Sequence, residues 1–334
     1  MDVDRKKKLE EMLASGKMSE TLYNEIMKRW GEVDSSGEEK NEEAADNMNI
    51  KLGSLKFEGE ERKDEEMKEE PRRERSKKIK LSGSSRISSV YAEELSVSGS
   101  ITVEGTMDSN CMDISGSCRV EEDVISSDTI DSSGSMRIGG NVKANRIDSS
   151  GSLRVQGAME VVEMDSSGSI VAESVKCEEF KSSGSANIAH AISARNIDTS
   201  GKATAESIEC ITLKSSGTVE VETLKGEELY FLGRVRAKSV NATRFQLKIY
   251  EMDTQIERLE AKIVEVTLQK RKFFSGGANI DEILCSRASL ESTKTRYVKG
   301  DEIFIGAGCV IDYVEAKTIE ISDNARVKEK KIVT

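Results

Sequence analysis

The side chains best suited to chemistry in this chain are one histidine, six cysteines and many serines. The histidine, His190, falls at an expected corner in the stretch 187–191 and has no cysteine or aspartate patterned around it. We therefore expect a surface histidine, not a metal ligand or a general base. The serines lack a recognisable partner base, without which a hydroxyl is a weak nucleophile.

The cysteines form no Cys-x-x-Cys pair, so their spacing indicates neither a zinc site nor a redox motif. The N-terminus shows no signal peptide, which leaves these thiols without an oxidising compartment. We expect them to be small buried apolar residues or free thiols. They are Cys111, Cys118, Cys177, Cys210, Cys285 and Cys309.

The sequence contains no Gly-rich phosphate loop before a helix, no G-x-S-x-G elbow and no metal-ligand spacing. Pectin-lyase-like and glycosidase β-helices need paired acids in a cleft, so a sugar-active enzyme would require a carboxylate-lined groove. Hexapeptide acyltransferases need a six-residue repeat and a catalytic histidine, and the repeat of this chain does not fit that pattern. Ice-binding solenoids expose regular serine or threonine rows, but they carry a secretion signal. We predict that the protein is not an enzyme and has no catalytic residue, cofactor or metal.

Composition narrows the class of fold and of partner. Aromatic residues make up 4% of the chain and there is one proline, so the core must be built from aliphatic side chains. The net charge of -11 argues against nucleic acid as a partner, because phosphate neutralisation needs a basic surface. No apolar run is long enough to span a bilayer, so we expect a cytoplasmic protein without direct membrane insertion.

The clearest pattern is a repeated Ser-Gly-Ser unit whose glycines recur at a nearly even spacing. The residues four positions before and four positions after every glycine are apolar, which a flexible Ser/Gly linker would not maintain. The glycines are Gly83, Gly99, Gly116, Gly134, Gly151, Gly168, Gly184, Gly201, Gly217 and Gly233. The apolar residues four positions before them are Ile79, Leu95, Met112, Ile130, Ile147, Met164, Phe180, Ile197, Leu213 and Leu229.

This repeat predicts a mainly β fold. The offsets −4, −2, 0, +2 and +4 around each glycine follow the period of a strand and should face one core. A unit of roughly 16–18 residues is too short for a β-α-β unit but suits one coil of a single-stranded parallel β-helix, or β-solenoid. We expect roughly three short strands per coil, with right-handed winding as the default. The glycine column should mark a narrow edge where the wall bends, with the flanking serines facing outward.

The chain divides into four segments. Residues 1–30 are predicted to form a small helical hairpin, an oligomerisation or docking module. Residues 31–78 are rich in Glu, Lys, Asp and Ser, which predicts a disordered charged tether. Residues 79–245 form the regular solenoid. Residues 246–334 are a divergent section that either continues the solenoid or caps it.

In the divergent section, the pairs Ile303/Ile305 and Ile319/Ile321 are still separated by the repeat spacing. Residues 249–268 are ambiguous, because their apolar residues also match a helical heptad. We favour continued solenoid there, since a helix would interrupt a stacked edge on both sides.

The even aliphatic coils, recurrent glycines, charged N-terminal tail and absence of catalytic residues resemble the bactofilin family of polymer-forming cytoskeletal proteins, over residues 79–240. The resemblance implies a right-handed β-helix that polymerises end to end, without nucleotide, into scaffold filaments. The chain departs from that family in having more coils, a helical N-terminal module and a divergent C-terminal section. The N-terminal hairpin itself resembles the short helix-turn-helix modules of the SHOCT type.

An uncapped solenoid end presents unpaired amide and carbonyl groups, which form a template for another rod. The partner would then be the chain itself, as a homopolymer or homo-oligomer. The expected end contacts are Ile79, Leu81, Ile87 and Val90 at one end and Ile319, Ile321 and Val327 at the other. The alternative is a monomeric or small-oligomer adaptor that recruits a protein partner through residues 5–30.

Overall fold

A computed structural model describes residues 75–249, 254–269 and 277–333 of the chain. The predicted hairpin of residues 1–30 lies outside the described residues, as does most of the predicted tether of residues 31–78.

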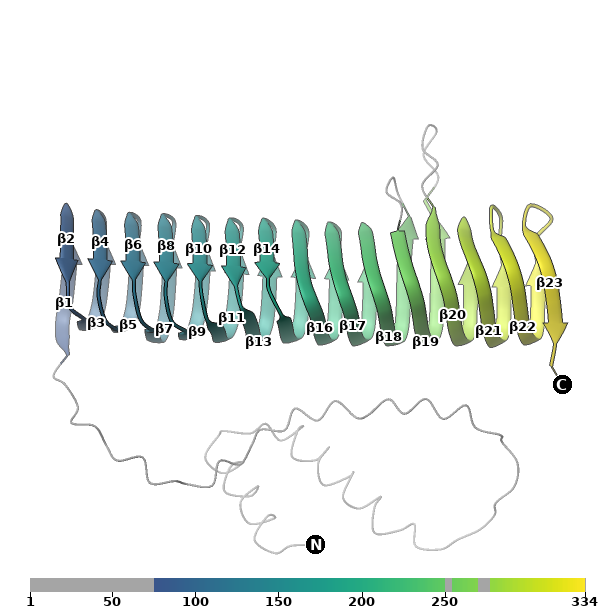
Figure 1. The fold of residues 1–334 in the computed structure, drawn as a ribbon, viewed down its shortest axis with the longest axis horizontal. Helices are drawn as coiled ribbons and strands as arrows, with labels where there is room; N and C mark the ends of the chain where they lie inside the picture. Colours follow the sequence, from purple (N-terminus) through teal and green to yellow (C-terminus); the bar gives the residue numbers. More distant parts are fainter. Residues whose placement is uncertain (1–74, 250–253, 270–276, 334) are drawn as a thin grey trace, which may run out of the picture. The chain divides into compact units, whose positions relative to one another are not determined.

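The described residues form a parallel β-solenoid, which confirms the predicted fold class (Figure 1). About 15 turns of the chain stack on one another, and every strand pair between neighbouring turns is parallel. Parallel strands lie about 4.8 Å apart, so this number of turns gives a solenoid roughly 70 Å long.

In the N-terminal part, each coil has a longer strand followed, after the Ser-Gly bend, by a strand of four residues. The strands of this part are β1 (Ser76–Leu81), β2 (Ser84–Ile87), β3 (Val90–Val97), β4 (Ser100–Val103), β5 (Met107–Ile114), β6 (Ser117–Val120), β7 (Val124–Ser132), β8 (Ser135–Ile138), β9 (Val142–Ser149), β10 (Ser152–Val155), β11 (Ala158–Ser166), β12 (Ser169–Ala172), β13 (Ser174–Ser182), β14 (Ser185–Ile188) and β15 (Ala191–Thr199).

In the C-terminal part, each coil is one continuous strand that runs through the second corner. In β16, for example, the backbone pairs with the next coil on both sides of Glu206. The expectation of three short strands per coil is therefore wrong, because this corner is turned without breaking the ladder. The strands of this part are β16 (Lys202–Ser215), β17 (Thr218–Phe231), β18 (Arg234–Ile249), β19 (Thr254–Leu268), β20 (Ala278–Leu290), β21 (Thr293–Ile305), β22 (Val310–Ile321) and β23 (Arg326–Ile332).

The core consists of columns in which equivalent residues of successive coils stack. Met164, for example, lies between Ile147 and Phe180, and all three are buried. Because side chains alternate along each strand, the neighbouring positions Glu163 and Asp165 face solvent. Burial of one continuous aliphatic interior stabilises coils that could not fold alone.

A bulge absorbs the longest spacing in the repeat, which lies between Gly116 and Gly134. The pairing between β5 and β7 shifts register between Ser109 and Cys111. One extra residue is thereby accommodated while Met112 still stacks on Ile130. Coil length can therefore vary without loss of the core columns.

The solenoid continues beyond residue 245 without a break, since β18 spans that position. The C-terminal section pairs coil on coil through to β23, so the favoured interpretation of residues 249–268 is confirmed for the described ones. Ile256 and Leu259, which also fit a helical heptad, lie buried in strand β19. The heptad alternative is wrong there because each residue completes a core column instead of a helix face.

Candidate functional site

The glycine column lies at the predicted bend, but the reason for glycine is close stacking. Apart from Gly83, whose φ is +79°, these glycines do not have the left-handed backbone that favours glycine. Instead, a Cβ at Gly151 would lie 1.8 Å from the carbonyl oxygen of Gly134 in the preceding coil. These glycines are half-buried at the corner, except the exposed Gly83, so they do not continue the fully buried inward row as expected.

A column of buried hydroxyls runs beside the glycines, two residues before each one. It lies between Ile114 and Phe231 and comprises Ser132, Ser149, Ser166, Ser182, Thr199 and Ser215. Ser166 donates a hydrogen bond to the Ser149 carbonyl at 3.1 Å, whereas the other hydroxyls have no hydrogen-bond partner among the residues that the structure describes. These positions carry serine or threonine because only a small side chain fits at this narrow edge of the coil, not because the hydroxyls form hydrogen bonds.

The N-terminal end of the described solenoid is an open coil. Among the described residues, β1 pairs only with β3, and β2 pairs only with β4. Three of the expected contacts, Ile79, Leu81 and Ile87, are partly buried and lie at this edge. The fourth, Val90, is 2% exposed and belongs to the interior.

The C-terminal end is open in the same way, because among the described residues β23 pairs only with β22. Ile319 and Val327 are partly buried, and the side chain of Ile321 is 38% exposed. Sequence reasoning missed Ile332, which is 64% exposed and follows Ala316 in its column. The apolar interior therefore reaches solvent at both ends.

Lys330 is the second residue that sequence reasoning missed. It stacks on Val314 in a column that is otherwise apolar and buried from Val90 onward. Lys330 is exposed and has no ion-pair partner among the described residues. Val314 follows Val298 at the regular repeat spacing, and one more repeat of that spacing leads to Lys330. This pattern in the sequence could have predicted the position of Lys330.

Both end coils are basic. Residues 75–89 contain five basic side chains and no acidic one, and β23 contains four basic residues and one glutamate. Some of these charges are paired with nearby coils. Arg75 reaches Asp108 of the second coil along at 2.8 Å, and Lys328 pairs with Asp312 of the adjacent coil at 2.7 Å. The ends thus combine exposed apolar residues with lysines, the residue type that protects many sheet edges.

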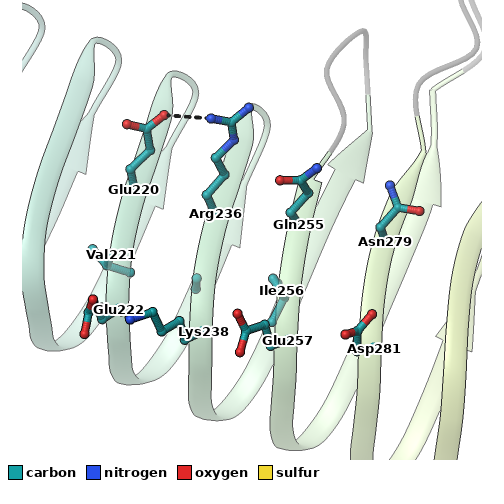
Figure 2. A pocket seen from close by; sticks show the side chains of 11 residues that line it. Glu220, Val221, Glu222, Arg236, Lys238, Gln255, Ile256, Glu257, Asn279 and Asp281 are labelled. Carbon is teal, nitrogen blue, oxygen red and sulfur yellow. Dashed lines mark hydrogen bonds and ion pairs between the residues drawn. The ribbon is translucent and has the colours of Figure 1, made fainter.

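A shallow groove of about 650 Å³ crosses β17 to β20 on the side of the solenoid (Figure 2). Its lining includes Glu220, Glu222 and Asp281, the carboxylates that a sugar-active enzyme would require. Glu220 bonds Lys202 at 2.6 Å and lies 3.5 Å from Arg236, and Glu222 pairs with Lys238.

The electrostatics of this groove differ from those of a glycosidase site. A glycosidase acid needs a raised pKa, whereas the hydrogen bond from Lys202 lowers the pKa of Glu220 below its usual range. Glu220 therefore remains ionised at neutral pH. In this groove, Glu220 and Glu222 each pair with a basic side chain of an adjacent coil.

The histidine is exposed, whereas five of the six cysteines are buried. His190 is exposed at a corner, as expected, with Glu206 at 3.2 Å from Nδ1 and Glu173 at 3.8 Å from Nε2. Burial raises the pKa of Cys118 to about 11 and that of Cys177 to about 12, so these thiols are not nucleophiles at neutral pH. No group of side chains with metal-binding geometry occurs among the described residues.

No model of a protein family, no curated protein and no solved structure matches this chain. Within the described part of the chain, no helix has the length and apolarity needed to cross a membrane. The open end coils, where apolar columns reach solvent, are the main candidate for a functional surface.

Proposed function

We propose that this chain is a non-enzymatic scaffold whose solenoid joins other copies end to end, giving bactofilin-like filaments that need no nucleotide. The observation that supports this most is the pair of open ends, where apolar columns emerge beside unpaired backbone groups. A strand edge of this kind pairs readily with another strand.

Geometry favours joining at the ends over joining at the sides. The sides carry charged rows with salt bridges between coils, such as Arg258–Glu282 at 2.9 Å and Arg287–Glu302 at 2.7 Å. The side chains of these ion pairs are largely exposed and already have partners within the solenoid. The ends would gain both backbone hydrogen bonds and apolar burial on contact.

The test is microscopy and sedimentation of the untagged full chain without nucleotide. We expect long assemblies for the natural chain and their loss in Ile321→Glu, which places a charge in the end surface. Ile125→Glu is the matched control, because Ile125 is 40% exposed on the side of the solenoid. Filaments that persist in a folded Ile321→Glu variant would reject the C-terminal end as a contact.

A second candidate function is a discrete rod that recruits a protein partner through residues 5–30. The lysines on β1 and β23 favour it, because edge lysines oppose pairing with another chain. A small species of fixed size at all protein concentrations would support this adaptor and exclude the filament.

A further inference from the structure

We propose that copies of this chain also associate side by side, with parallel axes, through two charged rows that flank the corner formed by the Ser-Gly-Ser glycines. The acidic row of one copy faces the basic row of the next, so the partner is a second copy of this chain. The inference concerns the sides of the solenoid and therefore goes beyond the proposed end-to-end assembly, on which it does not depend.

The acidic row lies three residues before the glycines of four successive coils. Asp113 stacks on Asp131, Asp131 on Asp148, and Asp148 on Asp165. All four side chains are exposed, and within the described part of the chain only Asp148 has an ion-pair partner, Arg146 at 3.8 Å. Burial, together with Asp148 and Asp113, raises the pKa of Asp131, so the charges in this row disfavour one another.

The basic row lies three residues after the glycines of three of these coils. Arg119 stacks on Arg137, and Arg137 stacks on Arg154. Arg119 pairs with Glu121 at 2.7 Å, whereas Arg137 and Arg154 are exposed and have no ion-pair partner among the described residues. Like charges directly opposite one another destabilise strand pairs, so both rows gain from an opposite row outside the chain.

The two rows match in spacing because both follow the stacking of coils, about 4.8 Å apart. The coil of Gly134, for example, carries Asp131 in β7 on one side of the corner and Arg137 in β8 on the other. The solenoid is nearly straight, so rows that are matched at one coil stay opposite along the axis (Figure 1). Three Asp–Arg pairs form when two copies lie at equal height.

Residues further along the same two columns favour parallel axes. Lys214 and Tyr230 extend the acidic column, and Glu220 and Arg236 extend the basic one. Parallel copies set Lys214 against Glu220 and Tyr230 against Arg236, an ion pair and a cation–π pair. An antiparallel contact centred on the Asp–Arg pairs carries these residues past the first coil of the partner.

The match reappears at the C-terminal end of the two columns. Phe304 and Val310 are 43% and 39% exposed, and parallel copies bring these apolar side chains together. The next coil sets the exposed Glu320 against the exposed Arg326. In these columns of the described coils, like charges meet only at the first one, where Lys80 faces Arg86.

The contact joins two different faces of the solenoid. Each contact therefore leaves one copy with a free acidic row and the other with a free basic row. A third copy can join in the same way, so the rods gather in a ring or a bundle with parallel axes.

A charge exchange in the full chain tests the pairing by sedimentation velocity. The natural chain and the Ile321→Glu chain, in which the proposed end joint is blocked, are both measured. We expect Arg137→Glu and Asp131→Lys, each alone, to raise the concentration needed for lateral association about tenfold, because each opposes like charges. Higher salt should weaken the association of the natural chain as well, since exposed charges are screened.

Mixing the two variants is expected to restore the association. The lysine introduced in one variant then faces the glutamate introduced in the other, and the remaining contact is the natural one. Lys176→Glu is the matched control, because Lys176 is exposed in another column, between Glu160 and Ser193. Circular dichroism checks that every variant is folded.

Cross-linking tests the parallel alignment, in a Cys111→Ser background because Cys111 is the one cysteine that is not fully buried. Asp198 and Thr204 flank Gly201, beyond the charged rows. A short thiol-to-thiol reagent is expected to link Asp198→Cys to Thr204→Cys in a mixture and to link neither variant to itself. Linkage of a single variant, or none in the mixture, would overturn the parallel contact.

The outcomes separate this inference from the proposed function. Filaments one rod wide, with both charge variants behaving like the natural chain, would overturn the lateral contact and leave end-to-end assembly intact. Lateral species that respond to the charge exchange, in a chain that never forms filaments, would support the contact and reject the proposed function.

Discussion

Gly151 stacks so closely on Gly134 that a Cβ on Gly151 would lie 1.8 Å from the Gly134 carbonyl oxygen. That oxygen also accepts a hydrogen bond from the backbone amide of Ser152 at 3.0 Å. The glycine column is thus a place where backbone packs directly on backbone. Its substitution tests the coil geometry itself.

Gly151→Ala is expected to destabilise the solenoid by about 3 kcal/mol or more, because two coils must separate to admit the methyl group. Urea unfolding followed by circular dichroism measures the change. Gly83→Ala is the control, since no described residue other than its chain neighbours comes within 4 Å of its Cβ position and only the positive φ is strained. Its expected cost is about 1 kcal/mol. Equal losses for the two variants would contradict the stacking argument.

Ser182→Ala is expected to stabilise the protein by about 1 kcal/mol, because its hydroxyl is buried without a hydrogen-bond partner and its removal relieves a desolvation cost. Ser166→Ala is the matched variant, because the Ser166 hydroxyl does donate a hydrogen bond to Ser149. The two substitutions should change the free energy of unfolding in opposite directions. A loss of stability in both would show that the Ser182 hydroxyl has a partner.

Asp131→Asn is expected to stabilise the protein at neutral pH by about 0.5 kcal/mol at most, because the site is exposed and screened. Burial, together with Asp148 and Asp113 on the adjacent coils, raises the pKa of Asp131 above its ordinary value. A raised acid pKa means that ionisation destabilises the folded state at pH values above that pKa. The destabilisation disappears as the pH falls below the ordinary aspartate pKa.

Urea titrations of Asp131→Asn and the natural chain at neutral and acid pH measure this difference. The stability gap should close as the solution is acidified. A gap that is independent of pH would assign the effect to the amide side chain and not to charge repulsion. Asp198→Asn is a control on the same column, because Lys181 and Lys214 flank Asp198 there.

The thiols should react in two classes with a disulfide reagent at mildly alkaline pH. Cys111 is partly exposed, whereas the other five cysteines are buried. Burial raises the pKa of Cys210 and of Cys285 to about 12, so both lack access and thiolate character. In the folded protein we expect one thiol to react, and to react slowly, whereas all six should react after denaturation. Rapid reaction of several thiols in the native state would contradict the described core.

The sequence by itself determined the coil and its core. Apolar residues in phase with the glycines are enough to predict a solenoid, because alternation along a strand decides which side chains share an interior. The burial of Ile147, Met164 and Phe180 follows from that alternation alone. The outward serines beside most of the glycines follow from it too.

Only the tertiary structure decided how coils of unequal length align. Phe245 stacks on Val264 and Val264 on Ala288, although both steps along the chain are longer than the regular repeat and the second is longer than the first. Because these two insertions differ in length, the spacing of residues along the sequence could not predict which side chains stack from β18 to β20. The carboxylates gathered in the side groove depend on that alignment. Contacts between coils arise from which residues stack, and stacking is a property of the folded register, not of the chain's local pattern.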